Sequence, residues 1–330
     1  MTTTRRTLVT AAVTAPFLDV ARRARAQSGT QIRISTAGPP SDFIVKALEQ
    51  IKADVTAANV GLDVSVHPAS TLFKQGTEVP ALQRGNLEMS TMNTFEVAQQ
   101  VAELGYFDRA YLFRDYGHMR AVFDGPVGED FRKTVEAKMG ITILATHYLG
   151  TRQVNLRQKR EVKTPADLAG VKMRMPAGPE WLLLGRTLGV TPVPLGMPEI
   201  YLALKTGTVD GQENPLSILN AAKFYEVTEQ VVLTAHMIQP VFFSIAQPVW
   251  GKLNADQKEA LGDAALKAAK TGSDARLADE TAIATTLNSR GLSVDAVDLG
   301  PFREQADRVY AQSDLAKAWD AAGLARVTKA

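Results

Sequence analysis

Hydrophobic and polar residues alternate along the chain with two periodicities, one typical of strands and the other of helices. Residues 32–35 and 62–66 place an apolar side chain at every second position, as a strand with one buried face does. Between them, residues 43–55 carry an apolar side chain at every fourth position, which predicts an amphipathic helix. This strand–helix–strand order is typical of α/β proteins with largely parallel sheets.

Two further strands are predicted near the middle of the chain. Residues 141–145 form a nearly continuous apolar run, which is expected of a strand covered on both faces. Residues 171–175 alternate Val, Met and Met with polar side chains, and this pattern ends at Pro176. Strands thus recur between helical segments, which supports the α/β prediction.

A short helix over 198–205 has clear start and stop signals. Pro198 stands at its first position and Gly207 follows its end, which is the usual placement of these two residue types. Leu202 and Leu204 would help to seat this helix on a sheet.

A much longer helical stretch runs from Asn254 to Ser289. Asn254 is suited to cap its start, with Gln257 three residues on, and Gly291 supplies its end. Because glycine weakens a helix interior, Gly262 and Gly272 predict a bend or two helices in this stretch. A helix of this length can reach across two domains.

The first 26 residues resemble an export signal rather than part of the fold. Arg5-Arg6 is followed by an apolar stretch at 7–18 that is too short to span a bilayer. Ala24-Arg25-Ala26 then offers a cleavage site before Gln27. The arginine pair indicates the twin-arginine route, so we predict a periplasmic protein that begins near Gln27. The alternative is an amphipathic N-terminal helix.

The charge balance changes once this signal is set aside. The signal holds five Arg and one Asp, so the remaining chain has 32 basic and 34 acidic residues and offers no basic surface for nucleic acid. The chain has no cysteine, which excludes disulfides, thiolate nucleophiles and thiolate metal sites. Beyond the signal no apolar run reaches membrane-spanning length, so we expect a soluble mature protein.

Little in the sequence indicates catalysis. The four histidines, His67, His118, His147 and His236, have no metal-ligand spacing, and we expect structural or surface roles for them. Phosphate-binding, dinucleotide-binding and nucleophile-elbow motifs are all missing from the sequence. We therefore predict no enzyme, no metal and no cofactor.

Two arginines stand out by their positions. Arg152 follows the apolar run at 141–149, and Arg174 lies inside the strand predicted at 171–175, where arginine is uncommon. A guanidinium group held at a strand end can bind a carboxylate through two parallel hydrogen bonds. The alternative is a salt bridge from each arginine to a nearby Asp or Glu.

From Gly150 onward the chain carries a series of ordered motifs. They are Gly170-Val-Lys-Met-Arg174-Met-Pro176, Leu188-Gly189-Val-Thr-Pro-Val-Pro194, Glu199-Ile-Tyr-Leu-Ala-Leu204, Gly207-Thr-Val-Asp-Gly211, Gln212-Glu-Asn-Pro215 and Lys223-Phe-Tyr-Glu-Val227. With these motifs the chain resembles the solute receptors of tripartite ATP-independent periplasmic (TRAP) transporters, the DctP family. The N-terminal half resembles them more loosely, through spacing and Gly85-Asn-Leu-Glu88.

The resemblance implies a two-lobed periplasmic binding protein fold with parallel or mixed sheets, crossover hinge strands and a long helix touching both lobes. Lobe I is expected to comprise residues 27–149 plus about 240–279. Lobe II is expected to comprise residues 150–239 plus about 280–330. The ligand cleft lies between the lobes, which close on the ligand by a hinge motion.

The resemblance also implies which residues meet the ligand. Arg174 falls on the family's principal carboxylate contact, Arg152 on a second carboxylate contact and Asn214 on a polar contact. Thr36, Gln75 and Asn93 fall where sialic-acid-type receptors place polar contacts, but those receptors carry acids at the last two positions, so a sialic acid receptor is not predicted. Met197 falls where an aromatic residue often packs on the ligand. Trp181 either stacks on a ligand ring or packs between helices.

We therefore expect an extracytoplasmic receptor that binds an organic acid carrying a carboxylate. It would deliver this acid to the small and large membrane subunits of a TRAP transporter, as a monomer. One alternative is a receptor for an ATP-driven importer, and a second is an enzyme of organic acids on a two-lobed scaffold. The sequence leaves sugar acids, keto acids, hydroxy acids, dicarboxylates and aromatic acids open as ligands.

Overall fold

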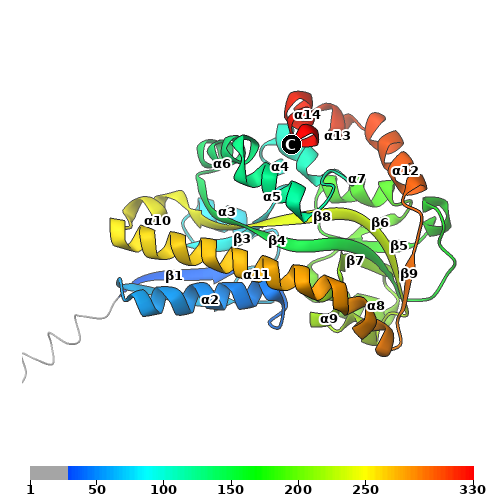
Figure 1. The fold of residues 1–330 in the computed structure, drawn as a ribbon, viewed down its shortest axis with the longest axis horizontal. Helices are drawn as coiled ribbons and strands as arrows, with labels where there is room; N and C mark the ends of the chain where they lie inside the picture. The colour runs from blue at the N-terminus through cyan, green and yellow to red at the C-terminus, as the bar shows by residue number, and fades with distance from the viewer. Residues whose placement is uncertain (1–28) are drawn as a thin grey trace, which may run out of the picture.

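A single nine-stranded sheet organises the chain in the computed structural model, which describes residues 29–330 (Figure 1). The predicted export signal lies outside these residues. The strands are β1 (Thr30–Ser35), β2 (Leu62–His67), β3 (Met89–Asn93), β4 (Ile141–Leu156), β5 (Lys172–Met175), β6 (Thr191–Pro194), β7 (Gly211–Pro215), β8 (Gln230–Ala246) and β9 (Ser293–Ala296).

Helices connect these strands and cover the sheet. The α-helices are α2 (Phe43–Ala58), α3 (Glu78–Gln83), α4 (Thr94–Ala98), α5 (Tyr116–Asp124), α6 (Pro126–Met139), α7 (Pro179–Thr187), α8 (Ile200–Thr206), α9 (Leu216–Ala221), α10 (Gln247–Lys252), α11 (Ala255–Ser289), α12 (Gly300–Ala311), α13 (Asp314–Lys317) and α14 (Ala321–Lys329). Short 3₁₀ helices are η1 (Ala102–Asp108), η2 (Pro165–Leu168), η3 (Met197–Glu199) and η4 (Phe224–Glu226). No helix within residues 29–330 is both long and apolar enough to cross a bilayer.

The sheet is parallel at its two sides and antiparallel at its centre. The strand order is β2-β1-β3-β8-β4-β7-β5-β6, and β9 pairs with β8. We call β2, β1 and β3 the β1 side, and β7, β5 and β6 the β5 side. β1 runs parallel to β2 and β3, and β5 runs parallel to β6 and β7. The long strands β4 and β8 run antiparallel to each other and join the two sides.

This topology confirms the predicted fold class, a two-lobed α/β fold with mixed strands and crossover strands. The expectation of largely parallel pairing holds within each side of the sheet but not at its centre. The strands predicted at 32–35, 62–66 and 171–175 correspond to β1, β2 and β5.

β4 is far longer than its predicted apolar run. It continues from the apolar residues through Arg152 to Leu156, and Arg152, Gln153 and Asn155 are buried within it. Because these buried residues are polar, hydrophobicity gave no signal for the second half of the strand. The register between β4 and β8 shifts at three places, one of them beside Gly150, where a Cβ would stand 2.6 Å from the Cβ of Pro215.

The helix predicted at 198–205 is split between η3 and α8. Gly207 ends it in the left-handed conformation, as expected. Ile200, Ala203 and Leu204 form its buried face, whereas Leu202 is 64% exposed. The prediction that Leu202 helps to seat the helix is wrong, because residues two apart point to different sides of a helix.

The long helix is one continuous element, α11, so of the two predicted alternatives, a bend or a division into two helices, the division is wrong. Its start is capped as predicted, by reciprocal hydrogen bonds between Asn254 and Gln257. Figure 1 shows α11 running from the neighbourhood of α2 and β1 toward α8 and α9, and it contacts α2, β4, α9 and β9. It therefore spans the molecule from the β1 side to the β5 side.

Gly272 has a packing role that explains a glycine in this helix. A Cβ at Gly272 would lie 2.7 Å from Cε1 of His147 and 3.1 Å from the Cβ of Ala47. The imidazole of His147 stacks on Phe243 and contacts the carbonyl of Ala269 at 3.2 Å through Nδ1, so it has little freedom to move away. Gly272 is thus the point at which α11 approaches β4 and α2 closely.

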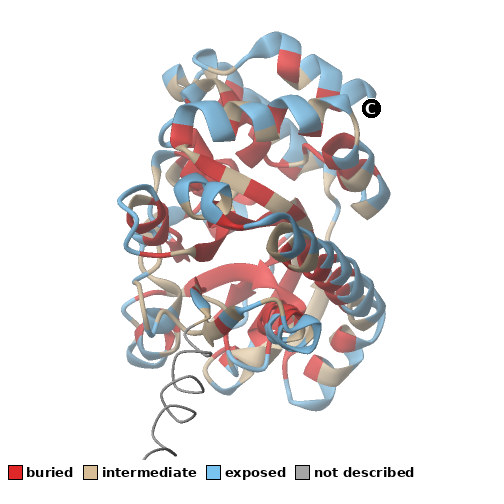
Figure 2. Cartoon of the chain, turned by 90° about the vertical axis from the view of Figure 1, so that its left-hand side faces the viewer, coloured by how far each residue is buried: buried red, intermediate tan, exposed pale blue. Residues whose placement is uncertain are grey.

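Buried residues gather on the sheet and on the helix faces turned toward it, while the outer helix faces are exposed (Figure 2). On the β1 side, Ile34 packs with Leu48 of α2 and Ala265 of α11. On the β5 side, Met173 packs with Leu184 of α7 and Phe302 of α12. The C-terminal helices link the two sides, because α12 contacts α7 and α14 contacts α6 and η1.

Three buried carboxyl groups come from α3, α4 and η1: Glu78, Glu96 and Asp108. Glu96 accepts hydrogen bonds from the backbone N–H and side-chain amide of Asn93 at 2.8 and 3.1 Å. Burial, together with the neighbouring Glu96, raises the pKa of Glu78 to about 8, and burial raises the pKa of Glu96 to about 7. Burial also raises the pKa of Asp108 well above its ordinary value. These carboxyl groups therefore hold protons in the folded protein at pH values where an unfolded chain would release them.

We expect Gly272→Ala to destabilise the protein by about 1–3 kcal/mol, the usual cost of overpacking a core. Gly262→Ala on the same helix is the matched control, because its nearest neighbour would be a Trp250 ring carbon at 3.9 Å. The control should be neutral or stabilising by up to about 1 kcal/mol, since alanine favours helices over glycine. Denaturant unfolding measures both, and equal stability of the two variants would contradict the packing role of Gly272.

We expect Glu96→Gln to change how stability depends on pH. Because the folded-state pKa of Glu96 is raised, its contribution to stability is present in acid and is lost as the pH rises through about 7. Relative to wild type, the variant should gain about 1–3 kcal/mol between pH 5 and pH 8.5. Thermal unfolding across this range measures the difference. Glu129→Gln, at an exposed residue of α6, should leave the profile unchanged, and parallel profiles for wild type and Glu96→Gln would refute the expectation.

Candidate functional site

One cavity lies between the β1 side and the β5 side, and all eight residues singled out in the sequence line it. Its empty volume, which includes open solvent, is about 540 Å³. The lining residues are Thr36, Ala37, Gly38, Pro39, Ile44, Gln75, Thr91, Asn93, Phe95, Leu149, Arg152, Arg174, Pro176, Trp181, Met197, Asn214, Ile218, Gln239 and Val241.

The fold explains why these distant residues meet. Thr36 directly follows β1, Asn93 ends β3, and Arg174 lies at the end of β5. The carboxyl ends of strands from both sides therefore reach the cavity, which is where open α/β sheets bind their ligands. The crossover strands pass beside it and contribute Arg152 from β4 and Gln239 from β8.

Arg174 is a buried cation without a carboxylate partner among the described residues. It is 1% exposed. Its Nε donates to the carbonyl of Leu195 at 2.8 Å and its Nη2 to Oε1 of Gln75 at 3.2 Å. A guanidinium has five N–H donors, so three remain, on Nη1 and Nη2, for a ligand.

The surroundings of Arg174 disfavour its charge. Burial lowers the pKa of Arg174 to about 9; Glu213 acts against this shift and the nearby Arg152 adds to it. The group still carries its charge at neutral pH, and an anion beside it would stabilise that charge. Arg174 therefore has the donors, the charge and the position that binding a carboxylate requires.

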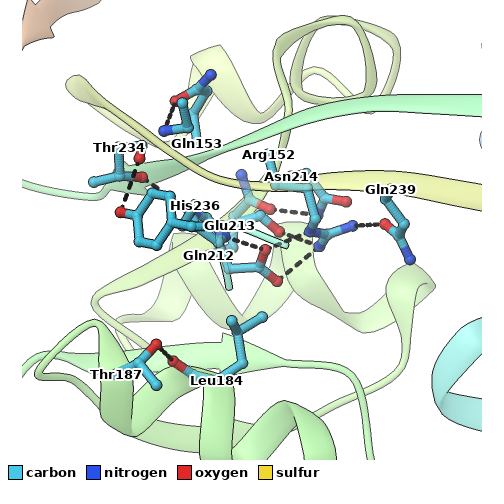
Figure 3. Close-up of polar contacts among 12 residues, drawn as sticks. Arg152, Gln153, Leu184, Thr187, Gln212, Glu213, Asn214, Thr234, His236 and Gln239 are labelled. Atoms are coloured by element: carbon cyan, nitrogen blue, oxygen red, sulfur yellow. Dashed lines mark hydrogen bonds and ion pairs between the residues drawn. The ribbon is translucent and has the colours of Figure 1, made fainter. Parts of the chain in front are cut away.

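Arg152 differs from Arg174, because it is already paired (Figure 3). Its Nε and Nη2 donate to the two carboxylate oxygens of Glu213 at 2.5 and 2.7 Å, and Nη2 also donates to the Glu213 carbonyl at 2.6 Å. Its Nη1 donates to Oε1 of Gln239 at 2.6 Å. Four of its five N–H groups are thus used. The alternative considered for this arginine, a salt bridge to a nearby acid, is what the structure shows, and one N–H on Nη1 remains.

Glu213 and His236 complete the buried polar group around Arg152. His236 lies 3.1 Å from Glu213 through Nε2, and its Nδ1 lies 2.8 Å from the hydroxyl of Thr234. Burial opposes ionisation of Glu213, yet Arg152 and His236 together hold the pKa of this carboxyl below its ordinary value. Burial lowers the pKa of His236, so the imidazole is neutral at neutral pH. His236 thus has a structural role, as expected.

Sequence reasoning did not single out Glu213 or Gln239. Glu213 belongs to the Gln212-Glu-Asn-Pro215 motif, and an acid on a fully buried strand beside a buried arginine was the available signal. Gln239 lies on β8, where polar and apolar residues are buried alike and no periodicity marks the strand.

The other polar residues of the cavity are neutral. Thr36 accepts a hydrogen bond from the hydroxyl of Thr91 at 2.8 Å, and Asn93 accepts one from Gln239 at 3.2 Å. The amide of Asn214 donates to Gln212 at 2.6 Å, which leaves its own oxygen available. These side chains offer donors and acceptors for hydroxyl groups without adding charge.

Gln75 connects the two sides across the cavity. It lies in the loop between β2 and α3, and its Oε1 accepts from Arg174 and from the backbone N–H of Met197 at 2.8 Å. Met197 lines the cavity beside it. Gln75, whose side chain is a neutral amide, therefore joins the loop after β2 to Arg174 and Met197 on the β5 side.

Trp181 lines the cavity and also packs against the guanidinium group of Arg152. The Arg152 guanidinium lies 4.6 Å from the centre of the indole ring, and Phe95 meets this ring edge to face at 5.9 Å. The indole is 1% exposed. Trp181 thus has the packing role that the sequence suggested as one alternative. It also lines the cavity, where the other alternative, stacking on a ligand ring, would take place.

No cluster of three or more His, Asp or Glu within residues 29–330 has the arrangement of a metal site. The ionisable residues that line the site are Arg152 and Arg174.

The family comparison agrees with this geometry. The family described as bacterial extracellular solute-binding protein, family 7 (DctP), matches residues 34–315. A solute-binding protein of Verminephrobacter eiseniae is 32% identical over 88% of this chain and 89% of its own length. This match favours the TRAP receptor over the receptor of an ATP-driven importer.

Solved structures agree in fold over almost the whole chain. A TRAP periplasmic solute-binding protein of Roseobacter denitrificans, with bound 3-deoxy-D-manno-oct-2-ulosonic acid, is 38% identical with a TM-score of 0.88, over 92% of this chain and 99% of that one. One of Polaromonas, bound to D-erythronate, is 29% identical with a TM-score of 0.83, over 91% and 98%. The chain thus belongs to the DctP family of TRAP periplasmic solute-binding proteins.

Proposed function

We propose that this protein captures a sugar acid, a polyhydroxylated carboxylate, in the cavity between its two sides. The observation that supports this most directly is Arg174, a buried charge with three N–H donors left and no carboxylate bonded to it among residues 29–330. A carboxylate could accept from Nη1 and Nη2 in parallel, the geometry that guanidinium groups favour. The ligands of the Roseobacter and Polaromonas proteins are both hydroxylated carboxylic acids.

The rest of the cavity suits the remainder of such a ligand. The remaining N–H of Arg152 would support the carboxylate, while Asn214, Asn93 and Thr36 would meet hydroxyl groups. Apolar residues such as Leu149, Met197 and Val241 would pack against its carbon chain. The proposed binding site thus consists of Gln239 and the eight residues predicted from the sequence, which are Thr36, Gln75, Asn93, Arg152, Arg174, Trp181, Met197 and Asn214.

We further propose the lobe division expected from the sequence, with lobe I at 27–149 plus about 240–279 and lobe II at 150–239 plus about 280–330. A ligand held by Arg174 on one side and by Thr36 and Asn93 on the other would favour the closed arrangement, because only that arrangement allows all contacts. The closed form is then what the two membrane subunits of a TRAP transporter would recognise. The protein would act as a monomer and release its ligand unchanged.

We expect Arg174→Ala to weaken sugar acid binding by about 2–5 kcal/mol, since it removes one partner of a buried charge pair. Arg174→Lys keeps the charge but loses the planar fork, so it should weaken binding by a smaller amount. Isothermal titration calorimetry with the tightest acid from a thermal-shift screen measures both. Arg186→Ala, at an exposed arginine of α7, is the matched control and should bind as wild type does.

A ligand whose carboxylate is amidated separates a contact from damage to the fold. Amidation should weaken binding to wild type about as much as Arg174→Ala does, and should have little further effect on that variant. Folded Arg174→Ala protein that binds the free acid within about twofold of wild type would show that this arginine is structural.

We expect the mature protein to begin near Gln27 and to reach the periplasm by the twin-arginine route. Replacing Arg5 and Arg6 by lysine should leave the precursor in the cytoplasm, because that route reads the arginine pair. Cell fractionation and N-terminal sequencing measure both outcomes. Protein that is isolated from the cytoplasm of the native cell with Met1 intact would contradict the prediction.

A further inference from the structure

We propose that the binding cavity accepts one negative charge only, and that Glu213 is the residue that sets this limit. The inference rests on the proposed function and goes beyond it, since it selects monocarboxylates over dicarboxylates of the same carbon skeleton. Glu213 acts through Arg152, so it is a specificity-determining residue that need not touch the ligand.

The cavity is lined by two cations and no anion among the described residues. Among its lining residues only Arg152 and Arg174 are ionisable, and the polar remainder consists of hydroxyl and amide groups. Glu213 does not line the cavity but lies behind Arg152, fully buried. His236, on the far side of Glu213, is buried and neutral.

The Arg152–Glu213 pair is electrically neutral as a unit. Two N–H groups of Arg152 meet the two carboxylate oxygens, and a third meets the Glu213 carbonyl. Trp181 covers the guanidinium from another direction. Held between a carboxylate and an aromatic ring, the charge of Arg152 is compensated before any ligand arrives.

Arg174 has no such partner. Its two hydrogen bonds go to a backbone carbonyl and to the neutral amide of Gln75. Glu199 is nearby in η3, but it is exposed and accepts from the backbone N–H of Gly196. The cavity therefore has one net positive charge, at Arg174.

One carboxylate neutralises the cavity, whereas a second would be buried without a counter-charge. Burying an unpaired ion is among the most costly events in protein energetics, and no lining residue among the described ones is left to offset it. The hydroxyl and amide groups on the wall can instead bond to ligand hydroxyls. A second carboxylate in place of a terminal hydroxyl should therefore be rejected.

The experiment compares two matched pairs of acids, D-erythronate with meso-tartrate and D-galactonate with galactarate. Within each pair the skeleton is the same and only the number of carboxylates changes. Calorimetry at pH 7.5 should show that wild type binds the better monocarboxylate at least about 100-fold more tightly than its dicarboxylate, a difference of about 2.7 kcal/mol.

Glu213→Gln tests the residue itself. It keeps an oxygen to accept from Arg152 but removes the negative charge, so the cavity would carry two positive charges. The preference for monocarboxylate should fall at least about tenfold through tighter binding of the dicarboxylate, that is, by about 1.4 kcal/mol. Glu180→Gln is the control, because this buried carboxyl of α7 pairs with neither arginine, and its preference should match wild type.

Gln239→Glu provides a second test that does not depend on Glu213. It adds a negative charge on the other side of Arg152, where Nη1 now donates to Gln239, and so cancels the net charge of the cavity. Monocarboxylate binding should fall at least about tenfold without any gain for dicarboxylates.

The outcomes separate the two levels of proposal. Wild type that binds no sugar acid in the thermal-shift screen, including the members of both pairs, would overturn the sugar acid function, and this inference with it. Wild type that binds both members of a pair equally, or an unchanged preference in folded Glu213→Gln, would overturn the charge limit while leaving the sugar acid function intact.

Discussion

The antiparallel pairing of β4 with β8 is the constraint on which the rest of the structure depends. These two strands are the only ones in the described sheet that link its parallel sides, and every other strand adds to one of them directly or through a neighbour. They also bring Arg152 and Gln239 to the cavity from opposite strands. Their pairing shifts register three times, and regular hydrogen bonding is interrupted there. The same two strands thus hold the sides together and shape the wall of the site.

Local periodicity predicted the elements whose apolar residues recur at a regular spacing. β1, β2, β5 and α2 show regular apolar spacing, and the cap of α11 is a local signal read correctly. β8 and the second half of β4 were not predicted, because their buried positions are occupied by residues such as Arg152, Asn155 and Gln239. Pairing partners far along the chain, rather than hydrophobic spacing, make those segments strands. The packing role of Gly272 could not be predicted from the sequence either, because its close neighbours lie on β4 and α2, far away along the chain.

The resemblance to a family singled out eight residues that line the cavity, and the chemistry of the residues alone had indicated only Arg152 and Arg174. An arginine inside a strand suggested either a ligand contact or a salt bridge, and the sequence left both open for Arg152 and Arg174. The structure resolves the pair in opposite ways, since Arg152 is bound to Glu213 and Arg174 is not bound to any acid among the described residues. That difference depends on β4 and β7 lying side by side, which no local pattern encodes.

The unequal state of the two arginines has a consequence for the empty protein. In the lobe closure proposed above, closing the cavity without a ligand would leave Arg174 with neutral acceptors only, the Leu195 carbonyl and the Gln75 amide, and would remove the solvation of its charge. Neither acceptor carries a negative charge that could compensate the guanidinium. An anion reverses the balance, because it stabilises the same charge that closure would bury. If the lobes close as proposed, the buried charge itself would link closure to occupancy, and the closed shape would then report that a carboxylate is inside.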